Sequence, residues 1–234
     1  MGIVILIAVL LHLACSYLKL RGCKMKKADN EASIRPRLKI ALSIKYFILL
    51  PAIILALVFY SVNPKCSILI RVNLVVWINY LGLLLLITSL PLKVGSYKTL
   101  GQNWSAKIAI YKQHSLVTTG TYGLVRHPVY MSNLMIALGT FLATGSLSLL
   151  MLGLGYLGSD LIRSKEEEAL LYQKFGHEYA RYRKRVGGFI PMALQHSILV
   201  FIIFCNLIGI IDGFIFSLSG YSFTIQVLSS WLPP

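Results

Sequence analysis

Charged residues are scarce in this chain: they make up 13% of its 234 residues, against 56% that are hydrophobic. Soluble domains carry roughly 25% charged residues, and a soluble fold of this length could not bury so much apolar surface. A lipid-facing fold does not need to bury it, because the bilayer core is itself apolar. The composition therefore predicts an all-α, polytopic integral membrane protein.

Acidic residues are especially few, eight against 23 lysines and arginines, so the net charge is +15. Such a charge invites a nucleic-acid interpretation, but its distribution argues against one. Eight basic residues fall in 21–45, five in 93–126 and seven in 163–185. Basic loops remain on the cytoplasmic side of a membrane. The charge therefore predicts three cytoplasmic segments and an N-terminus outside, with attraction to anionic membrane lipids as a second effect.

Cysteines are also few, and the four that occur are scattered without a C-x-x-C. They indicate neither zinc ligation nor a disulfide framework. The motifs H-E-x-x-H, G-x-G-x-x-G and the P-loop are absent as well, so we expect no metal site and no soluble-type nucleotide fold. A site for a nucleotide-like cofactor would have to be built from loops and helix ends.

Long apolar runs are what the sequence does contain, and a membrane-spanning helix needs about 20 mostly apolar residues. The candidate spans are 3–20, 40–62 with a kink at Pro51, 72–92 and 198–218. The run 130–162 is too long for one span, and Thr144-Gly145-Ser146 near its middle predicts a helical hairpin. The first run lacks a basic n-region and a clear cleavage site, so we expect a retained helix. The total is about six transmembrane helices.

Two polar segments, 101–130 and 163–191, flank the predicted hairpin, which should bring both to one face of the membrane. Arg126 and His127 directly precede Pro128, a residue suited to the first turn of a helix. Free N–H groups at a helix N-terminus favour an anion, so this pair is a candidate carboxylate or phosphate clamp. A basic juxtamembrane anchor is the alternative.

Arg163 and Glu167 are four residues apart and share a helix face, with Asp160 one turn earlier. Ionisable residues close to membrane depth are functional candidates. The alternative is a structural ion pair, either Asp160–Arg163 or Arg163–Glu167.

An apolar stripe within 166–185 predicts an amphipathic helix along the membrane surface; its members are Leu170, Leu171, Phe175 and Tyr179. We divide the chain into N-terminal transmembrane helices (1–99), a core with the hairpin and the amphipathic helix (100–191), and a C-terminal helix with a tail (192–234).

The segments H-S-L-V-T-T-G-T-Y-G-L-V-R-H-P-V-Y (114–130) and R-S-K-E-E-E-A-L-L-Y-Q-K-F-G-H-E-Y-A-R-Y-R-K-R-V (163–186) carry a specific resemblance. In order and at compatible spacing, they resemble the isoprenylcysteine carboxyl methyltransferase family. Its members are membrane enzymes that use S-adenosylmethionine and are related to phospholipid methyltransferases. The resemblance covers about 100–191 and implies that this region is a methyltransferase core.

The resemblance also implies roles for individual residues. Arg163, Glu167 and Arg126 would be catalytic, with Arg163 facing a lipophilic, prenylcysteine-like methyl acceptor. His127 would bind the carboxylate of the cofactor and Glu167 its ammonium. The cofactor site on the cytoplasmic side would be lined by His114, Ser115, Leu116, Val117, Tyr122, His127, Pro128, Val129, Tyr130 and Glu167.

Three other functions compete with this one. A phospholipid N-methyltransferase would share the cofactor half, but its amine acceptor must lose a proton and no dedicated base is evident. A sterol-type reductase would use NADPH, but its Arg-Asp and Cys pattern is replaced here by a Glu-rich stretch before Phe175-Gly176. A transporter or scaffold would bind no cofactor, and substitution of Arg163 would then disturb assembly more than turnover.

Overall fold

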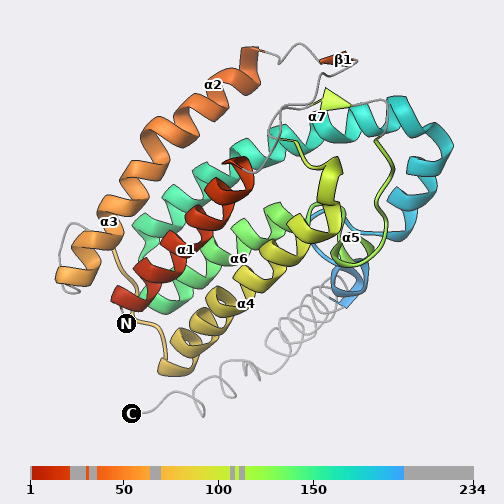
Figure 1. The fold of residues 1–234 in the computed structure, drawn as a ribbon. Coiled ribbons are helices and arrows are strands. Elements are labelled where there is room, and N and C mark those ends of the chain that lie inside the picture. The colour runs from red at the N-terminus through yellow and green to blue at the C-terminus, as the bar shows by residue number, and fades with distance from the viewer. Residues whose placement is uncertain are drawn as a thin grey trace, which may run out of the picture. The chain divides into compact units, whose positions relative to one another are not determined.

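The computed structural model describes residues 2–21, 30–31, 36–63, 70–105, 109–110 and 114–197. These residues are mostly helical (Figure 1). The elements are α1 (Gly2–Arg21), β1 (Asn30–Glu31), α2 (Pro36–Ile44), the π-helical turn η1 (Lys45–Leu49), α3 (Leu50–Val62), α4 (Val76–Leu100), the 3-10 turn η2 (Gly101–Asn103), β2 (Ala109–Ile110), α5 (Thr121–Leu124), α6 (Pro128–Thr144) and α7 (Leu147–Arg185). β1 and β2 pair antiparallel. The chain forms two compact units, 1–189 and 190–234, and the first contains every element named above.

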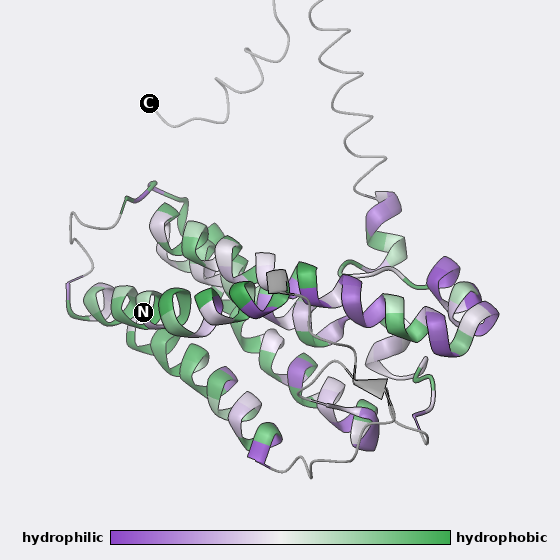
Figure 2. Ribbon diagram, turned by 90° about the horizontal axis from the view of Figure 1, so that it is seen from above, coloured by the Kyte–Doolittle hydropathy of each residue, from purple (hydrophilic) through white to green (hydrophobic). Residues whose placement is uncertain are grey.

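Three helical segments are long and apolar enough to cross a membrane, Gly2–Arg21, Leu38–Val62 and Val76–Asn103, and α6 is a shorter apolar helix. Their outer faces carry large hydrophobic side chains: Phe47 is 81% exposed and Trp77 is 80% exposed. Figure 2 shows hydrophobic residues over the helices near the N-terminus and hydrophilic ones gathered towards the far end of α7. So much outward apolar surface suits lipid and not water. The prediction of a helical integral membrane protein is confirmed; the span expected at 198–218 lies outside the described residues.

The predicted helical hairpin is present as α6 and α7, which meet at Gly145. This glycine has φ 68°, and its N–H donates to the carbonyl of Phe141. Its own carbonyl accepts from the Val72 N–H at 2.9 Å, and a Cβ there would lie 2.3 Å from the Val72 oxygen. The left-handed backbone and the close approach both require glycine, so Thr144-Gly145-Ser146 works as the turn that the sequence predicts.

The second hairpin helix is longer than the sequence suggests. We expect it to end near 162 and a separate amphipathic helix to follow, but α7 runs on without a break to a kink at Gly176, at φ 47° and ψ −116°, and a second helical part then continues to Arg185. Residues 165–171 are lysine, glutamate, alanine and leucine, all strong helix formers, so the break comes at the glycine and not near 162. In addition, Leu170, Leu171 and Tyr179 of the apolar stripe line an internal cavity.

The irregularity expected at Pro51 is a π-helical turn just before it. The Leu50 N–H donates to the carbonyl of Lys45, five residues back, and Pro51 lies in the first turn of α3. Widening by one residue is a known way for a helix to accommodate a missing proline N–H. The turn leaves the side chain of Lys45 buried, 4% exposed, inside the bundle.

The described parts of the three basic segments lie at one end of the bundle. Lys19 near the end of α1 reaches the carbonyl of Tyr97 near the end of α4, at 3.4 Å. Val125, just before α6, bridges Gly187, just after α7. Residues 70–75, before α4, lie with the α6–α7 turn at the opposite end, where Arg71 bridges Ser146 (Figure 1). This is the arrangement that the charge distribution requires, and the assignment of the basic end to the cytoplasm stays a prediction.

Helices α4 and α6 approach so closely at Gly82 that no side chain fits. A Cβ on Gly82 would lie 2.4 Å from the backbone nitrogen of Ala143 and 2.7 Å from the carbonyl oxygen of Gly139. We expect Gly82→Ala to destabilise the protein by about 1–3 kcal/mol, because two backbones must separate. Thermal unfolding in detergent measures the effect. The control is Gly158→Ala in α7, where a Cβ meets nothing within 4 Å; an equal loss in both variants would contradict this packing.

Candidate active site

A cavity of about 520 Å³ lies at the basic end of the bundle, between α1, η1, α4, α6, α7 and the residues 103–105 and 114–117. Its volume is within the roughly 300–1,000 Å³ of typical ligand sites. Most of the residues singled out in the sequence line it, namely His114, Ser115, Leu116, Val117, Tyr122, Arg126, His127, Val129, Tyr130, Arg163 and Glu167. Pro128 does not line it; this residue is fully buried at the start of α6. The two polar segments thus converge, as the hairpin predicts.

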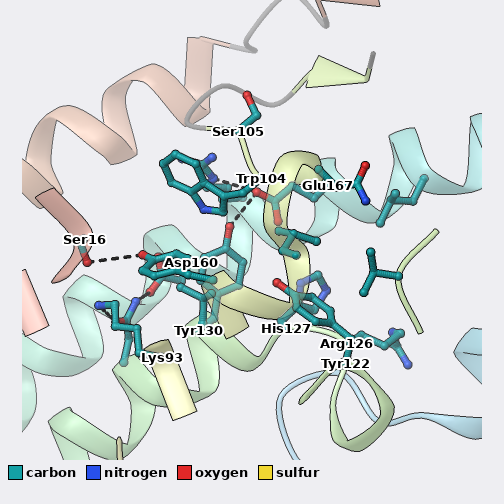
Figure 3. Close-up of a pocket in the computed structure, with 18 of the residues that line it drawn as sticks. Ser16, Lys93, Trp104, Ser105, Tyr122, Arg126, His127, Tyr130, Asp160 and Glu167 are labelled. Atoms are coloured by element: carbon teal, nitrogen blue, oxygen red, sulfur yellow. Dashed lines mark hydrogen bonds and ion pairs between the residues drawn. The ribbon is translucent and has the colours of Figure 1, made fainter. Parts of the chain in front are cut away.

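Glu167 joins α6 to α7 at the wall of this cavity. One carboxylate oxygen accepts from the Tyr130 hydroxyl at 2.8 Å and from Arg163 Nε at 2.9 Å (Figure 3). The Arg163–Glu167 pair is therefore formed, and both side chains also line the cavity. Glu167 keeps 29% of its side chain exposed, so its carboxylate can also reach a ligand.

Arg126 and His127 both bind a carboxylate, but it belongs to the protein. Glu168 Oε1 lies 3.0 Å from Arg126 Nε and 3.0 Å from His127 Nε2. The backbone is joined as well, since the N–H groups of Arg126 and His127 donate to the carbonyls of Gly187 and Gly188 at 2.8 and 3.0 Å. The segment after α7 is thereby tied to the start of α6.

Electrostatics around Glu168 stabilise the ionised carboxylate. Burial opposes ionisation, but hydrogen bonds from His127 and Arg126 and the Arg126 charge outweigh it and lower the pKa of Glu168 from 4.5 to about 2. A lowered folded-state pKa stabilises the fold fully above pH 4.5, and this contribution is lost as the pH falls towards 2. Glu168 therefore contributes stability only in its ionised form.

The pH dependence gives a measurable consequence. We expect wild-type protein to lose on the order of 2 kcal/mol of stability from Glu168 alone as acid protonates it. Thermal unfolding midpoints are measured from neutral pH into acid. At neutral pH the midpoint of Glu168→Gln should be below that of wild type, and it should fall less steeply as the pH is lowered. The exposed Glu178 of the same helix gives the control Glu178→Gln, which should keep the wild-type slope. Parallel slopes for wild type and Glu168→Gln would contradict the assignment.

The segment 114–122 is held beside the cavity by both polar and aromatic contacts. Asn103 exchanges two hydrogen bonds with Ser115, donating at 3.0 Å and accepting at 3.2 Å. The carbonyl of Tyr122 accepts from the Tyr182 hydroxyl at 2.6 Å. Burial, with a smaller effect from Glu167, raises the pKa of Tyr122, which therefore keeps its proton. Its ring is a neutral aromatic surface at the cavity wall.

A cluster of polar residues lies on the membrane side of the same cavity; we call Lys45, Lys93, Asn133 and Asp160 the inner polar cluster. Asp160 forms an ion pair with Lys45, whose ammonium lies 3.9 Å from the ring centre of Tyr156. Asn133 donates to Asp160 at 2.8 Å and accepts from Lys93 at 3.1 Å. Asp160 is thus part of an ion pair, as its position suggested, but its partner comes from η1.

Four residues of this region were not predicted from the sequence: Glu168, Lys45, Lys93 and Asn133. Glu168 stands in a run of three glutamates, and no sequence pattern separates it from its two neighbours. The other three are single polar residues within apolar runs, which is itself a recognised signal of function. In the part of the chain that the structure describes, no group of three or more His, Cys, Asp or Glu residues is placed to hold a metal ion.

Comparison with known proteins bears on the same region. The sequence model of the isoprenylcysteine carboxyl methyltransferase family matches residues 81–173. A protein-S-isoprenylcysteine O-methyltransferase of Schizosaccharomyces pombe is 40% identical over 95 residues, which cover 39% of this chain and 40% of that protein. The Homo sapiens protein of that name is 30% identical over 120 residues, 50% of this chain and 42% of that protein.

The shared region also occurs under another name. The cobalt-zinc-cadmium resistance protein CzcN of Cupriavidus metallidurans is 37% identical over 100 residues, 41% of this chain and 45% of that protein. A solved eukaryotic intramembrane Ras methyltransferase is similar at 22% identity and a TM-score of 0.43, over 69% of this chain and 54% of that one. The alignments span 40–45% of the length of the three sequence relatives. The resemblance found in the sequence is confirmed, over residues 81–173 instead of about 100–191. This stretch, which contains Tyr130, Arg163 and Glu167, matches the sequence model of the isoprenylcysteine carboxyl methyltransferase family.

Proposed function

We propose that this chain is a membrane methyltransferase that uses S-adenosylmethionine and methylates the carboxylate of an isoprenylcysteine-like lipophile. One observation supports this most: Glu167, Arg163 and Tyr130 converge on one cavity inside the segment that matches the methyltransferase family. The cavity holds an acidic group, a basic group and aromatic surface within a bundle that faces lipid. A site that binds both a charged cofactor and a lipophilic acceptor needs such groups.

The residues of the cavity fit the cofactor by their chemistry. S-adenosylmethionine carries an ammonium, a carboxylate, a sulfonium and an adenine. Glu167 is a carboxylate suited to the ammonium, while Leu116, Val117 and Tyr122 offer apolar and aromatic surface to the adenine. Aromatic rings such as that of Tyr130 also favour a nearby cation.

The acceptor requires orientation more than activation. When bound, S-adenosylmethionine supplies a methyl group on a sulfonium sulfur, which a carboxylate oxygen can accept without any proton transfer. A terminal carboxyl has a pKa of roughly 3.5, so it is ionised at neutral pH and needs no general base. Arg163 lines the cavity, and its guanidinium is a planar fork of donors that suits a carboxylate. Holding the reacting groups in line supplies much of the rate in such transfers.

The structure is less suited to an amine acceptor. An amine must lose a proton before it accepts a methyl group, so a phospholipid N-methyltransferase needs a base. Among the described lining residues the carboxylates, Asp160 and Glu167, are held in ion pairs, and the His127 imidazole lies 3.0 Å from Glu168. His114 is the other imidazole that lines the cavity. We therefore propose the carboxylate as the methyl acceptor.

The cofactor assignment can be tested by calorimetry on detergent-purified protein. We expect S-adenosylmethionine to bind in the micromolar range and NADPH to show no binding. Preferential binding of NADPH by a folded, monodisperse sample would favour the sterol-type reductase. Binding of neither ligand would contradict both enzymes and leave the transporter or scaffold interpretation.

A further inference from the structure

Lys93 is a buried lysine whose charge is not matched by a protein carboxylate in the part of the chain described. It belongs to α4 and is 4% exposed. Its ammonium donates to the side-chain oxygen of Asn133 at 3.1 Å, which is a neutral acceptor. An ammonium has three N–H donors, so this one bond leaves two for another partner.

The neighbouring charges of the cavity are already paired. Lys45 binds Asp160, Arg163 binds Glu167, and Arg126 binds Glu168. Among the described lysines and arginines that line the cavity, Lys93 is the one without an ion-pair partner. A buried charge without a counter-ion is costly, and at membrane depth such a residue is a functional candidate.

Asn133 fixes the direction in which Lys93 is held. Its amide nitrogen donates to Asp160 at 2.8 Å, so its oxygen must face the lysine. The chain of contacts runs from Lys45 through Asp160 and Asn133 to Lys93 and anchors each side chain. Figure 3 places Lys93 and Asp160 at one side of the cavity, and Tyr122, Arg126 and His127 at the other.

The depth of the cluster suits an acceptor that enters from lipid. Asn133 lies five residues beyond Pro128, the first residue of α6, or about 7.5 Å further along the helix axis. Lys93 also lines a smaller pocket with apolar residues from α1, α3 and α6, including Val9, Ile53 and Ile136. An anionic group at Lys93 would therefore have apolar surface beside it for a hydrocarbon tail.

We propose that Lys93 binds the carboxylate of the lipophilic acceptor and, oriented by Asn133, selects an anionic acceptor over a neutral one. This inference rests on the proposed function for the identity of the acceptor. It adds a contact from α4 to the acceptor carboxylate, whereas the family resemblance implied only Arg163 of α7 for that role. Lys93 is thus a specificity residue of the acceptor half of the cavity.

The test compares two probes that differ only in charge: N-acetyl-S-farnesylcysteine and its carboxamide. The dissociation constant of each probe is measured in a nonionic detergent, without cofactor, by its ability to displace a fluorescent ligand from the protein. Wild-type protein should prefer the carboxylate by about tenfold to a hundredfold, the effect of one charge-assisted hydrogen bond. Lys93→Met should lose most of this preference while binding the carboxamide as before, since only the Arg163 contact to the carboxylate then remains. Lys93→Arg should keep most of the preference.

Lys98→Met is the matched control, because Lys98 is exposed on the same helix and does not line the cavity. Lys93→Gln replaces Lys93→Met if the latter is not monodisperse. A preference of wild-type size in Lys93→Met or Lys93→Gln overturns the inference. Equal affinity of the wild-type protein for the two probes also overturns it. So does a competition experiment in which phosphatidylglycerol displaces a fluorescent ligand from the wild-type protein and N-acetyl-S-farnesylcysteine does not. S-adenosylmethionine binding, measured on the same samples, shows separately whether the proposed function fails.

Discussion

Replacing Glu167 with glutamine is expected to weaken S-adenosylmethionine binding about tenfold to a hundredfold. The carboxylate that we assign to the cofactor ammonium would become a neutral amide, and hydrogen bonds to charged groups contribute roughly 1.5–3 kcal/mol. The Arg163 charge adds to the loss. Arg163 no longer has the Glu167 carboxylate at 2.9 Å, so its positive charge repels the ammonium of the cofactor. Calorimetry with the purified variant measures the change directly.

Glutamine is chosen because it can still accept a hydrogen bond from Tyr130, so the α6–α7 contact should persist. The matched control is Glu178→Gln, which removes one negative charge from an exposed position of the same helix. It should bind the cofactor like wild type. Unchanged affinity in a folded Glu167→Gln sample would contradict the role assigned to this carboxylate and leave the Arg163–Glu167 pair as a purely structural one.

Asp160→Ala is expected to be the most destabilising single substitution of the inner polar cluster. It leaves the buried ammonium of Lys45 without its counter-ion and Asn133 without an acceptor. Breaking a buried ion pair by removing one partner costs about 3–5 kcal/mol. For a protein of this size we expect the unfolding midpoint to fall by roughly 10 °C.

The double variant Lys45→Met with Asp160→Leu separates charge from packing. Replacing both members of a buried pair by apolar side chains is often neutral or stabilising, so the unfolding midpoint should recover most of its loss. It should stay below that of wild type, because Asn133 still lacks its acceptor. Thermal unfolding of wild type, the single variant and the double variant in one detergent makes the comparison. A double variant as unstable as Asp160→Ala would show that the cluster contributes something other than its paired charge.

Local rules explain what the sequence could predict. Apolar runs of sufficient length located the helices, Gly145 located the turn, and Pro128 located the start of α6. The i,i+4 spacing predicted that Arg163 and Glu167 share a helix face, and their ion pair is one of the two that the sequence left open. The convergence of 114–130 with 163–186 followed from the hairpin, and it brought together most of the residues expected at the site.

Long-range packing explains what the sequence could not show. Lys45 and Asp160 are 115 positions apart, and which lysine of an apolar run meets a given aspartate depends on how helices dock. The anion clamp of Arg126 and His127 was predicted for a ligand, yet Glu168 lies against both. Three consecutive glutamates give no pattern that separates the one that binds the clamp from the one that faces the cavity.

The most direct test of the central proposal is methyl transfer itself. Purified protein in lipid nanodiscs is incubated with methyl-labelled S-adenosylmethionine and N-acetyl-S-farnesylcysteine, and the product is analysed for a base-labile methyl ester. We expect the label in a methyl ester, from which alkali releases it as methanol. Methyl transfer should not occur when the carboxamide probe replaces the carboxylate. Label in a base-stable product, or no transfer by protein that binds the cofactor, would contradict carboxyl methylation of such a lipophile.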